Sequence, residues 1–102
     1  MTITKTEENG VVTFKPEGWL DTVSSPELAA KLEEVTEAKW LVLDFSMVEY
    51  MSSAGLRQVV AANKKAKAMG ASFSVSGVND NVMSIFKMTG LDSKLCILAA
   101  GN

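Results

Sequence analysis

Hydrophobic and polar residues alternate in two short segments at the start of the chain. Residues 3–7 and 11–15 favour β-strands, and the segment Glu8-Asn9-Gly10 separates them. Asn-Gly is a strong short-range signal for a tight hairpin turn, because both residues adopt the positive φ angles that such a turn needs. We therefore expect the chain to open with a β-hairpin.

The next pattern is helical. Residues 24–27, Ser-Ser-Pro-Glu, combine a capping residue, a proline suited to the first turn and an acid near the positive end of the helix dipole. Leu28, Leu32 and Val35 then form one apolar stripe, with charged residues on the remaining surface. This pattern predicts a helix that ends near Ala38 and buries one face.

A nearly continuous apolar segment follows at residues 40–45, Trp-Leu-Val-Leu-Asp-Phe. Such a run is typical of a strand that is covered on both faces, so we expect it to be the central strand of a sheet. After a link at residues 46–51, Ser52-Ser53 begins a second amphipathic helix that ends at Gly70.

The last third of the chain repeats the order of strand and helix. Residues 71–75 alternate as a strand, Asn79 or Asp80 caps a short helix that Gly90 ends, and residues 95–98 give the last strand. A hairpin followed by alternating helices and strands predicts an α/β fold, a mixed sheet with helices packed on it. The 102 residues, 47% of them hydrophobic, suffice for one core, so we expect a single domain over residues 1–102.

Charge and hydropathy narrow the choice of partners. Ten Lys and Arg residues stand against twelve Asp and Glu residues, which gives a net charge of −2. Because no basic run is longer than Lys64-Lys65, nucleic acids and anionic membranes are not expected partners. No apolar run approaches the length of a signal segment or a membrane span, and a cytoplasmic location fits best.

The sequence also limits the possible chemistry. It contains no histidine, so the commonest general base and the usual zinc ligand are missing. The single cysteine, Cys96, stands among apolar residues, which predicts a buried and inert thiol. Asp21 and Asp44 are better interpreted as a cap and a hydrogen-bond acceptor than as a metal pair. We expect no catalytic residue, metal or cofactor.

Ligands of open α/β sheets bind beyond the carboxyl ends of the strands. This rule brings the following polar positions to one edge of the sheet: Asp21, Thr22, Ser46, Ser52, Ser53, Gly77, Asn79 and Asp80.

Ser52 and Ser53 have two interpretations at the start of the second helix. Either hydroxyl can simply cap the helix. A serine at this place can also carry a phosphate, whose negative charge the helix N-terminus stabilises. The neighbouring Ala54-Gly55 leaves room for a partner's active site, although Gly55 can equally serve close helix packing. Met47 and Met51 flank Ser53 and offer an adaptable apolar contact.

A nucleophilic serine is the competing interpretation of a strand, a sharp link, a serine and a helix. The nucleophile elbow of α/β-hydrolases needs glycine two positions before the serine, and Met51 stands there before Ser53. No residue that could activate the hydroxyl is evident. A hydrolase is therefore not the favoured interpretation.

Residues 44–57, Asp-Phe-Ser-Met-Val-Glu-Tyr-Met-Ser-Ser-Ala-Gly-Leu-Arg, closely resemble the signature of STAS domains, the bacterial anti-sigma-factor antagonist family. Residues 18–21, Gly-Trp-Leu-Asp, look like the family's Gly-x-Leu-Asp at the end of the second strand. Residues 76–79 and 89–92 resemble its C-terminal landmarks. Together these matches cover nearly the whole chain.

The resemblance implies a partner-switching protein without enzymatic activity, a monomer or a weak dimer. It implies phosphorylation of Ser53 by an anti-sigma serine kinase and removal of the phosphate by a metal-dependent serine phosphatase. The unphosphorylated form would bind the kinase and free a sigma factor or another client. The residues expected at the partner are Asp21, Thr22, Ser46, Met51, Ser52, Ser53, Ala54, Gly55, Leu56 and Arg57.

The sequence departs from the family at two places. Many members carry an acid before the phosphorylated serine, whereas this chain has Ser52, which is the alternative acceptor. The C-terminal helix common in the family is expected to be absent, which would expose part of the sheet face. A second interpretation is a STAS subunit of a transporter or lipid-trafficking complex that binds an ATPase without phosphorylation.

Overall fold

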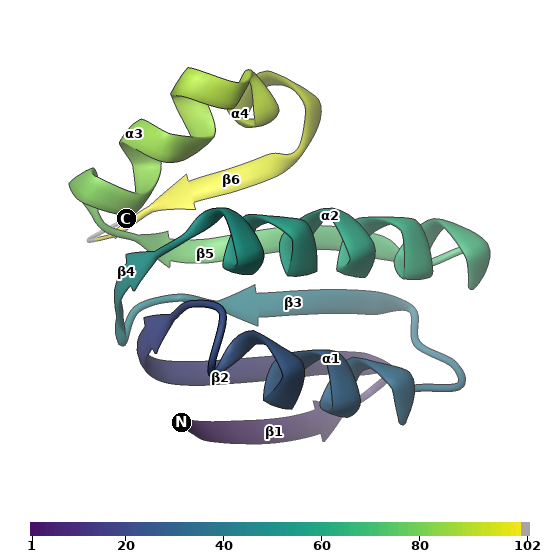
Figure 1. Cartoon of the computed structure of the whole chain (residues 1–102). Coiled ribbons are helices and arrows are strands. Elements are labelled where there is room, and N and C mark those ends of the chain that lie inside the picture. Colours follow the sequence, from purple (N-terminus) through teal and green to yellow (C-terminus); the bar gives the residue numbers. More distant parts are fainter. Residues whose placement is uncertain (101–102) are drawn as a thin grey trace.

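The computed structural model describes residues 1–100 as a mixed α/β fold (Figure 1). Within these residues it has six strands and four helices. The strands are β1 (Thr2–Glu8), β2 (Val11–Leu20), β3 (Trp40–Asp44), β4 (Val48–Met51), β5 (Ser72–Val78) and β6 (Cys96–Ala99). The helices are α1 (Ser25–Glu33), α2 (Ser53–Ala68), α3 (Asp80–Thr89) and α4 (Leu91–Lys94).

The sheet confirms the predicted mixed topology. Its strand order is β1-β2-β3-β5-β6, and β4 pairs separately with the end of β2. Among the strand pairs of the described residues, the β1–β2 hairpin is antiparallel and the other four pairs are parallel. Asn9 and Gly10 have φ angles of 53° and 83°, as the hairpin turn requires. The third strand, β3, lies between β2 and β5 and is the central strand, as the sequence predicted.

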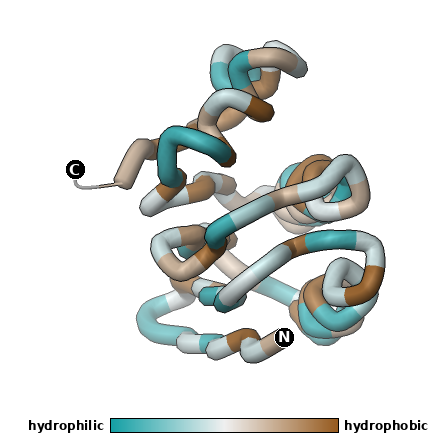
Figure 2. The backbone as a smooth tube through the Cα atoms, turned by 60° about the vertical axis from the view of Figure 1, so that its left-hand side comes forward, coloured by the Kyte–Doolittle hydropathy of each residue, from teal (hydrophilic) through white to brown (hydrophobic). Residues whose placement is uncertain are grey.

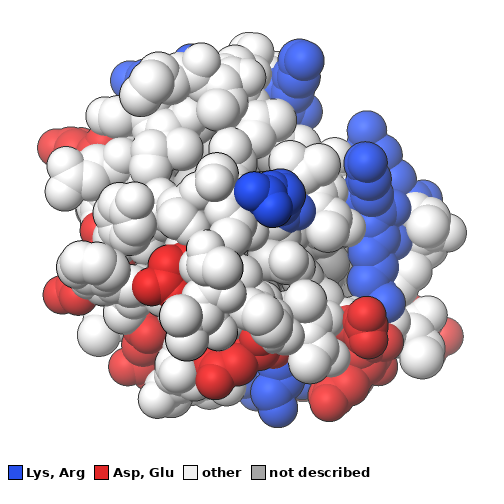
Figure 3. Space-filling view, viewed as in Figure 1, with Lys and Arg blue, Asp and Glu red and all other residues white. Residues whose placement is uncertain are grey.

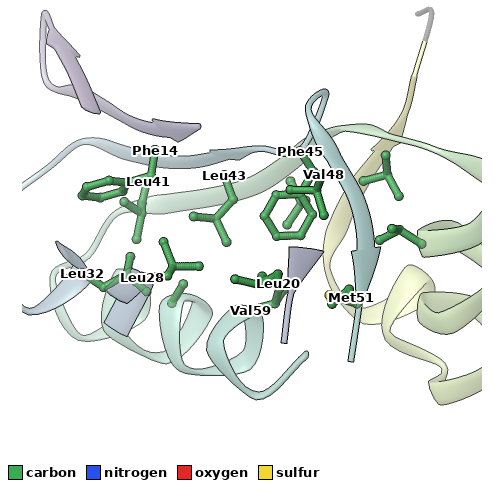
Figure 4. Packing of buried hydrophobic residues seen from close by; sticks show 14 of the residues in the cluster. Phe14, Leu20, Leu28, Leu32, Leu41, Leu43, Phe45, Val48, Met51 and Val59 are labelled. Carbon is green, nitrogen blue, oxygen red and sulfur yellow. The ribbon is translucent and has the colours of Figure 1, made fainter. Parts of the chain in front are cut away.

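The core lies between the sheet and the helices α1 and α2, which cover the same face of the sheet (Figures 1 and 2). In Figure 4, Leu41 and Leu43 of β3 point toward Leu28 of α1 and Val59 of α2. All four side chains are fully buried. Each such side chain contributes roughly 1.5–3 kcal/mol of hydrophobic stabilisation, so this layer holds α2 firmly in place.

The opposite face of β3 is open, so the prediction of a strand covered on both faces is wrong. The side chain of Trp40 is 45% exposed there. Its indole N–H donates a hydrogen bond to Ser74 Oγ, 3.0 Å away, on the adjacent strand β5. The tryptophan therefore has a polar partner on this face instead of a covering helix.

Three further predictions need correction. The first helix ends at Glu33 rather than near Ala38. Beyond it, the N–H of Val35 donates a hydrogen bond of 3.2 Å to Leu32 O, which closes a turn. The supposed link at residues 46–51 contains the strand β4. Cys96 is exposed, because it lies on the edge strand β6, where its side chain faces away from the half-buried Ile97.

All the parallel strands end on the left in Figure 1, and α1, α2 and α3 begin at that edge. The predicted meeting of strand ends and helix starts is confirmed. Within residues 1–100, no helix is long and apolar enough to cross a membrane.

Candidate functional site

The loop after β2 fixes the carboxylate of Asp21 at the edge of the sheet where the parallel strands end. The backbone N–H groups of Val23 and Ser24 each donate to Asp21 Oδ1 at 3.0 Å. Ser24 Oγ lies 3.2 Å from the same oxygen and 2.6 Å from Trp19 O, and it accepts the Asp21 N–H at 2.9 Å. The Ser24 N–H is the largest influence lowering the pKa of Asp21, with partial burial opposing it. The loop therefore holds Asp21 as an anion.

Ser52 caps α2 and ties it to β2. Its Oγ accepts a hydrogen bond from the N–H of Ala54 at 3.2 Å, and its own N–H donates to Leu20 O at 3.0 Å. The extended backbone of Ser52, with ψ of 179°, is the conformation expected of a cap. The capping interpretation is confirmed for this serine, whose hydroxyl is engaged in the fold.

Ser53 differs from its neighbour. It is the first residue of α2 and it is exposed. Its hydroxyl has no hydrogen-bond partner within the described residues 1–100. The first turn of α2 contains no acidic residue. Ser53 therefore presents an unengaged hydroxyl at a helix end that favours negative charge.

Gly55 brings the start of α2 into close contact with β2 and β4. A Cβ atom on this residue would lie 2.6 Å from Leu20 O and 2.8 Å from Met51 Cγ. Both distances are too short for any side chain larger than hydrogen. Of the two interpretations of Gly55, the one based on close packing is confirmed.

The comparison with protein families identifies the fold. The model of the STAS domain matches residues 2–99 of the chain. The chain belongs to the STAS domain family. The resemblance drawn from residues 44–57 is therefore confirmed.

Relatives of this STAS domain include proteins named anti-sigma factor antagonists. It is 32% identical to an "Anti-sigma-B factor antagonist" of Listeria monocytogenes over 76 residues, which are 72% of this chain and 67% of the relative. An anti-sigma factor antagonist from Mycobacterium paratuberculosis superimposes with a TM-score of 0.86 at 26% identity, covering 95% of this chain and 84% of that one. The phosphorylated Bacillus protein SpoIIAA has a TM-score of 0.75 at 15% identity, covering 94% and 90%, which shows the shared fold alone.

The structure separates the ten residues expected at the partner by their exposure. Thr22, Ser46, Ser53 and Arg57 are exposed, Asp21, Ser52, Ala54 and Leu56 are partly buried, and Met51 and Gly55 are buried. The expectation that Met51 offers an adaptable surface contact is wrong, because its side chain packs in the core (Figure 4). Met47 is 48% exposed and remains available for such a contact.

The other polar residues at this edge serve the fold. Asn79 caps α3 by accepting the N–H of Val82 at 2.8 Å, and its amide donates to Val48 O of β4 at 3.0 Å. Asp44 accepts the N–H of Ser46 at 3.0 Å, which confirms its interpretation as a strand-end acceptor. A Cβ on Gly77 would lie 2.8 Å from Ser46 N, so this residue too is required by packing.

The sequence did not reveal an exposed aromatic pair beside the site. Trp19 and Tyr50 are partners in the β2–β4 pairing, and their rings are 5.1 Å apart with an angle of 49° between the planes. Their side chains are 59% and 44% exposed. An exposed pair of large aromatic residues is typical of interaction surfaces. The sequence signal that could have revealed this pair is the position of both aromatic residues near the ends of strands, next to polar loops.

Charge is distributed unevenly around this edge. In Figure 3, viewed as in Figure 1, Lys and Arg side chains gather mainly at the centre and on the right, whereas the left edge at the level of the strands is mostly uncharged or acidic. Asp21, Glu49 and Asp80 lie on the segments that form this edge. The exposed aromatic pair therefore has acidic surroundings.

Proposed function

We propose that this STAS domain is an anti-sigma-factor antagonist, and that phosphorylation of Ser53 controls its binding to an anti-sigma serine kinase in the bacterial cytoplasm. The observation that carries the proposal is the contrast between adjacent serines: Ser52 Oγ caps α2, whereas Ser53 Oγ is exposed and unengaged. The names of the relatives support the choice of partner. Trp19 and Tyr50 would extend the contact, opposite an apolar surface with basic residues around it.

The chemistry of the switch belongs to the partners. The kinase transfers the γ-phosphoryl group of ATP to Ser53 Oγ, the hydroxyl proton is released, and ADP leaves. A metal-dependent serine phosphatase restores the hydroxyl by hydrolysis. The STAS domain has no histidine and acts as a substrate and a binding protein, without an enzymatic step of its own.

Phosphorylation acts through charge and bulk. A phosphate adds about 1.5 to 2 negative charges to a residue that enters the interface as a neutral hydroxyl. Burying that charge against the kinase carries a desolvation cost, and each 1.4 kcal/mol of lost binding energy lowers affinity about tenfold. Ser52 and Gly55 fix the start of α2 against β2, so the switch requires little refolding.

Mass spectrometry after incubation with the candidate kinase and ATP tests this proposal. We expect one phosphate on the wild-type protein and on Ser52→Ala, and none on Ser53→Ala. The kinase must be shown active on another substrate. A phosphate that disappears only in Ser52→Ala would move the site by one residue.

Absence of phosphate on the wild-type protein would contradict the proposal. It would favour a STAS subunit that binds an ATPase of a transporter or lipid-trafficking complex constitutively. If the wild-type protein is phosphorylated, a binding titration completes the test. The phosphorylated protein should bind the kinase at least tenfold more weakly than the unphosphorylated protein.

A further inference from the structure

Ser53 and Arg57 are neighbours on the surface of α2. They are four residues apart, a spacing that places their Cβ atoms about 5–6 Å from each other on one side of a helix. Both residues are exposed. The opposite side of α2 is buried against the sheet and α1, through Gly55, Val59, Ala62 and Ala66. The two side chains therefore project into solvent from the same strip of the helix.

The charge of Arg57 is not neutralised within the described residues 1–100. The ion pair found there joins the amino group of Met1 to Glu27, far from Arg57 in sequence and on another helix. The first turn of α2 contributes no acid. Arg57 is the fifth residue of α2 and lies one turn after Ser53. In the unphosphorylated protein it therefore carries a positive charge without an ion-pair partner among residues 1–100.

We infer that Arg57 is the counter-ion of a phosphate on Ser53. This inference rests on the proposed phosphorylation of Ser53. The guanidinium presents several N–H donors in a planar fork that matches the oxygens of a phosphate. An anion four residues before a cation is also the favourable order along a helix. Arg57 would hold the phosphate over the first turn of α2 and stabilise its dianionic form.

A phosphorus NMR titration of the phosphorylated protein tests the pairing directly. Phosphoserine can be incorporated at position 53 during translation, so the experiment does not depend on any kinase. The second pKa of a phosphoserine is normally about 6. In Arg57→Gln we expect this pKa to rise by about 0.2–0.7 relative to the wild-type protein, with a smaller rise in Arg57→Lys. The difference should shrink as salt is raised from 0.01 to 0.5 M.

Lys64→Gln is the matched control, because Lys64 is another exposed cation of α2, farther from Ser53 in the helix. It should change the pKa much less than Arg57→Gln. Equal phosphate pKa values in the wild-type protein and Arg57→Gln would overturn the inference and leave the phosphorylation of Ser53 untouched. Weaker kinase binding by unphosphorylated Arg57→Gln, together with an unchanged pKa, would instead assign Arg57 to the partner interface.

Discussion

The starts of α2 and α3 lie at the same edge of the sheet and are built alike, yet they differ at the first helical residue. Each follows an extended capping residue, Ser52 or Asn79, whose side chain accepts a hydrogen bond from a first-turn N–H. The next residue is Ser53 in α2 and Asp80 in α3. α3 therefore carries a permanent negative charge where α2 carries a hydroxyl that can acquire one.

The next turn differs in the same sense. Four residues after Asp80, Ser84 donates its hydroxyl to Asp80 O at 2.9 Å, whereas the corresponding residue of α2 is Arg57. The capping amide of Asn79 additionally reaches β4, while the hydrogen bond of Ser52 Oγ within residues 1–100 is the one from the N–H of Ala54 in α2. The start of α3 thus combines a capping side chain with a permanent negative charge in the first turn. The start of α2 has a similar capping side chain but no acidic residue in its first turn, which suits a reversible modification that adds a negative charge.

The largest effect should come from disrupting the close contact of the start of α2 with β2 and β4. In Gly55→Val the new side chain would collide with Leu20 O, and we expect the free energy of unfolding to fall by about 3 kcal/mol. Ala61→Val is the control, because Ala61 is an exposed position of α2 and loses only helix propensity, roughly 0.5 kcal/mol. Urea denaturation measures both. Equal losses would mean that the start of α2 is not tightly packed.

The two caps should differ in strength. Asn79→Ala removes the cap of α3 and the hydrogen bond to Val48 O, so we expect a loss of about 1–2 kcal/mol. Ser52→Ala removes one cap bond and should cost about 0.5–1 kcal/mol. Asn79→Asp keeps the cap but loses the amide donor, so its stability should lie between those of Asn79→Ala and the wild-type protein. A larger loss in Ser52→Ala would reverse the roles assigned to the two helix starts.

The helix caps and the hairpin turn were predictable from the sequence, because each depends on residues that are close together in the chain. The hairpin at Asn9-Gly10 and the cap at Asn79 follow from residues within one turn of each other. Strand β4 was missed because its burial does not alternate: Val48 and Met51 are buried and the two residues between them are exposed. Such a pattern does not fit a strand with one buried face, and the spacing of three resembles a helical one.

The features that the sequence did not predict depend on pairing between distant segments. Trp19 and Tyr50 meet only because β4 pairs with the end of β2 across a shift in register. Cys96 was expected to be buried from its apolar neighbours, but exposure of a strand residue depends on which face is covered. The open face, like the β2–β4 pairing, is set by the tertiary structure.

Exchanging the charges at the two helix starts should sharpen the comparison. Asp80→Asn removes the permanent charge of α3, and we expect a loss of about 0.3–1 kcal/mol in unfolding free energy. Ser53→Asp adds a charge to α2 and should increase stability by a similar amount. Both effects should shrink at 1 M salt. Only Ser53→Asp should weaken kinase binding; equal weakening by Asp80→Asn would show that the switch is not specific to α2.

The smallest effect concerns the carboxylate before α1. Because hydrogen bonds from Ser24 and Val23 lower the pKa of Asp21 in the folded protein, its ionised form stabilises the fold above the unfolded value of about 3.9. This contribution should disappear as the pH falls through the lower pKa of the folded state. Asp21→Asn keeps an acceptor for the loop but does not titrate.

We therefore expect the melting temperature of the wild-type protein to exceed that of Asp21→Asn by a constant margin between pH 5 and 7, and the margin to shrink below about pH 4. Ser53→Ala is the control: its difference from the wild-type protein should stay constant over this range, because the unphosphorylated start of α2 has no acid to titrate. A margin for Asp21→Asn that is unchanged at pH 3 would show that the hydrogen bonds of the loop do not depend on the charge of Asp21.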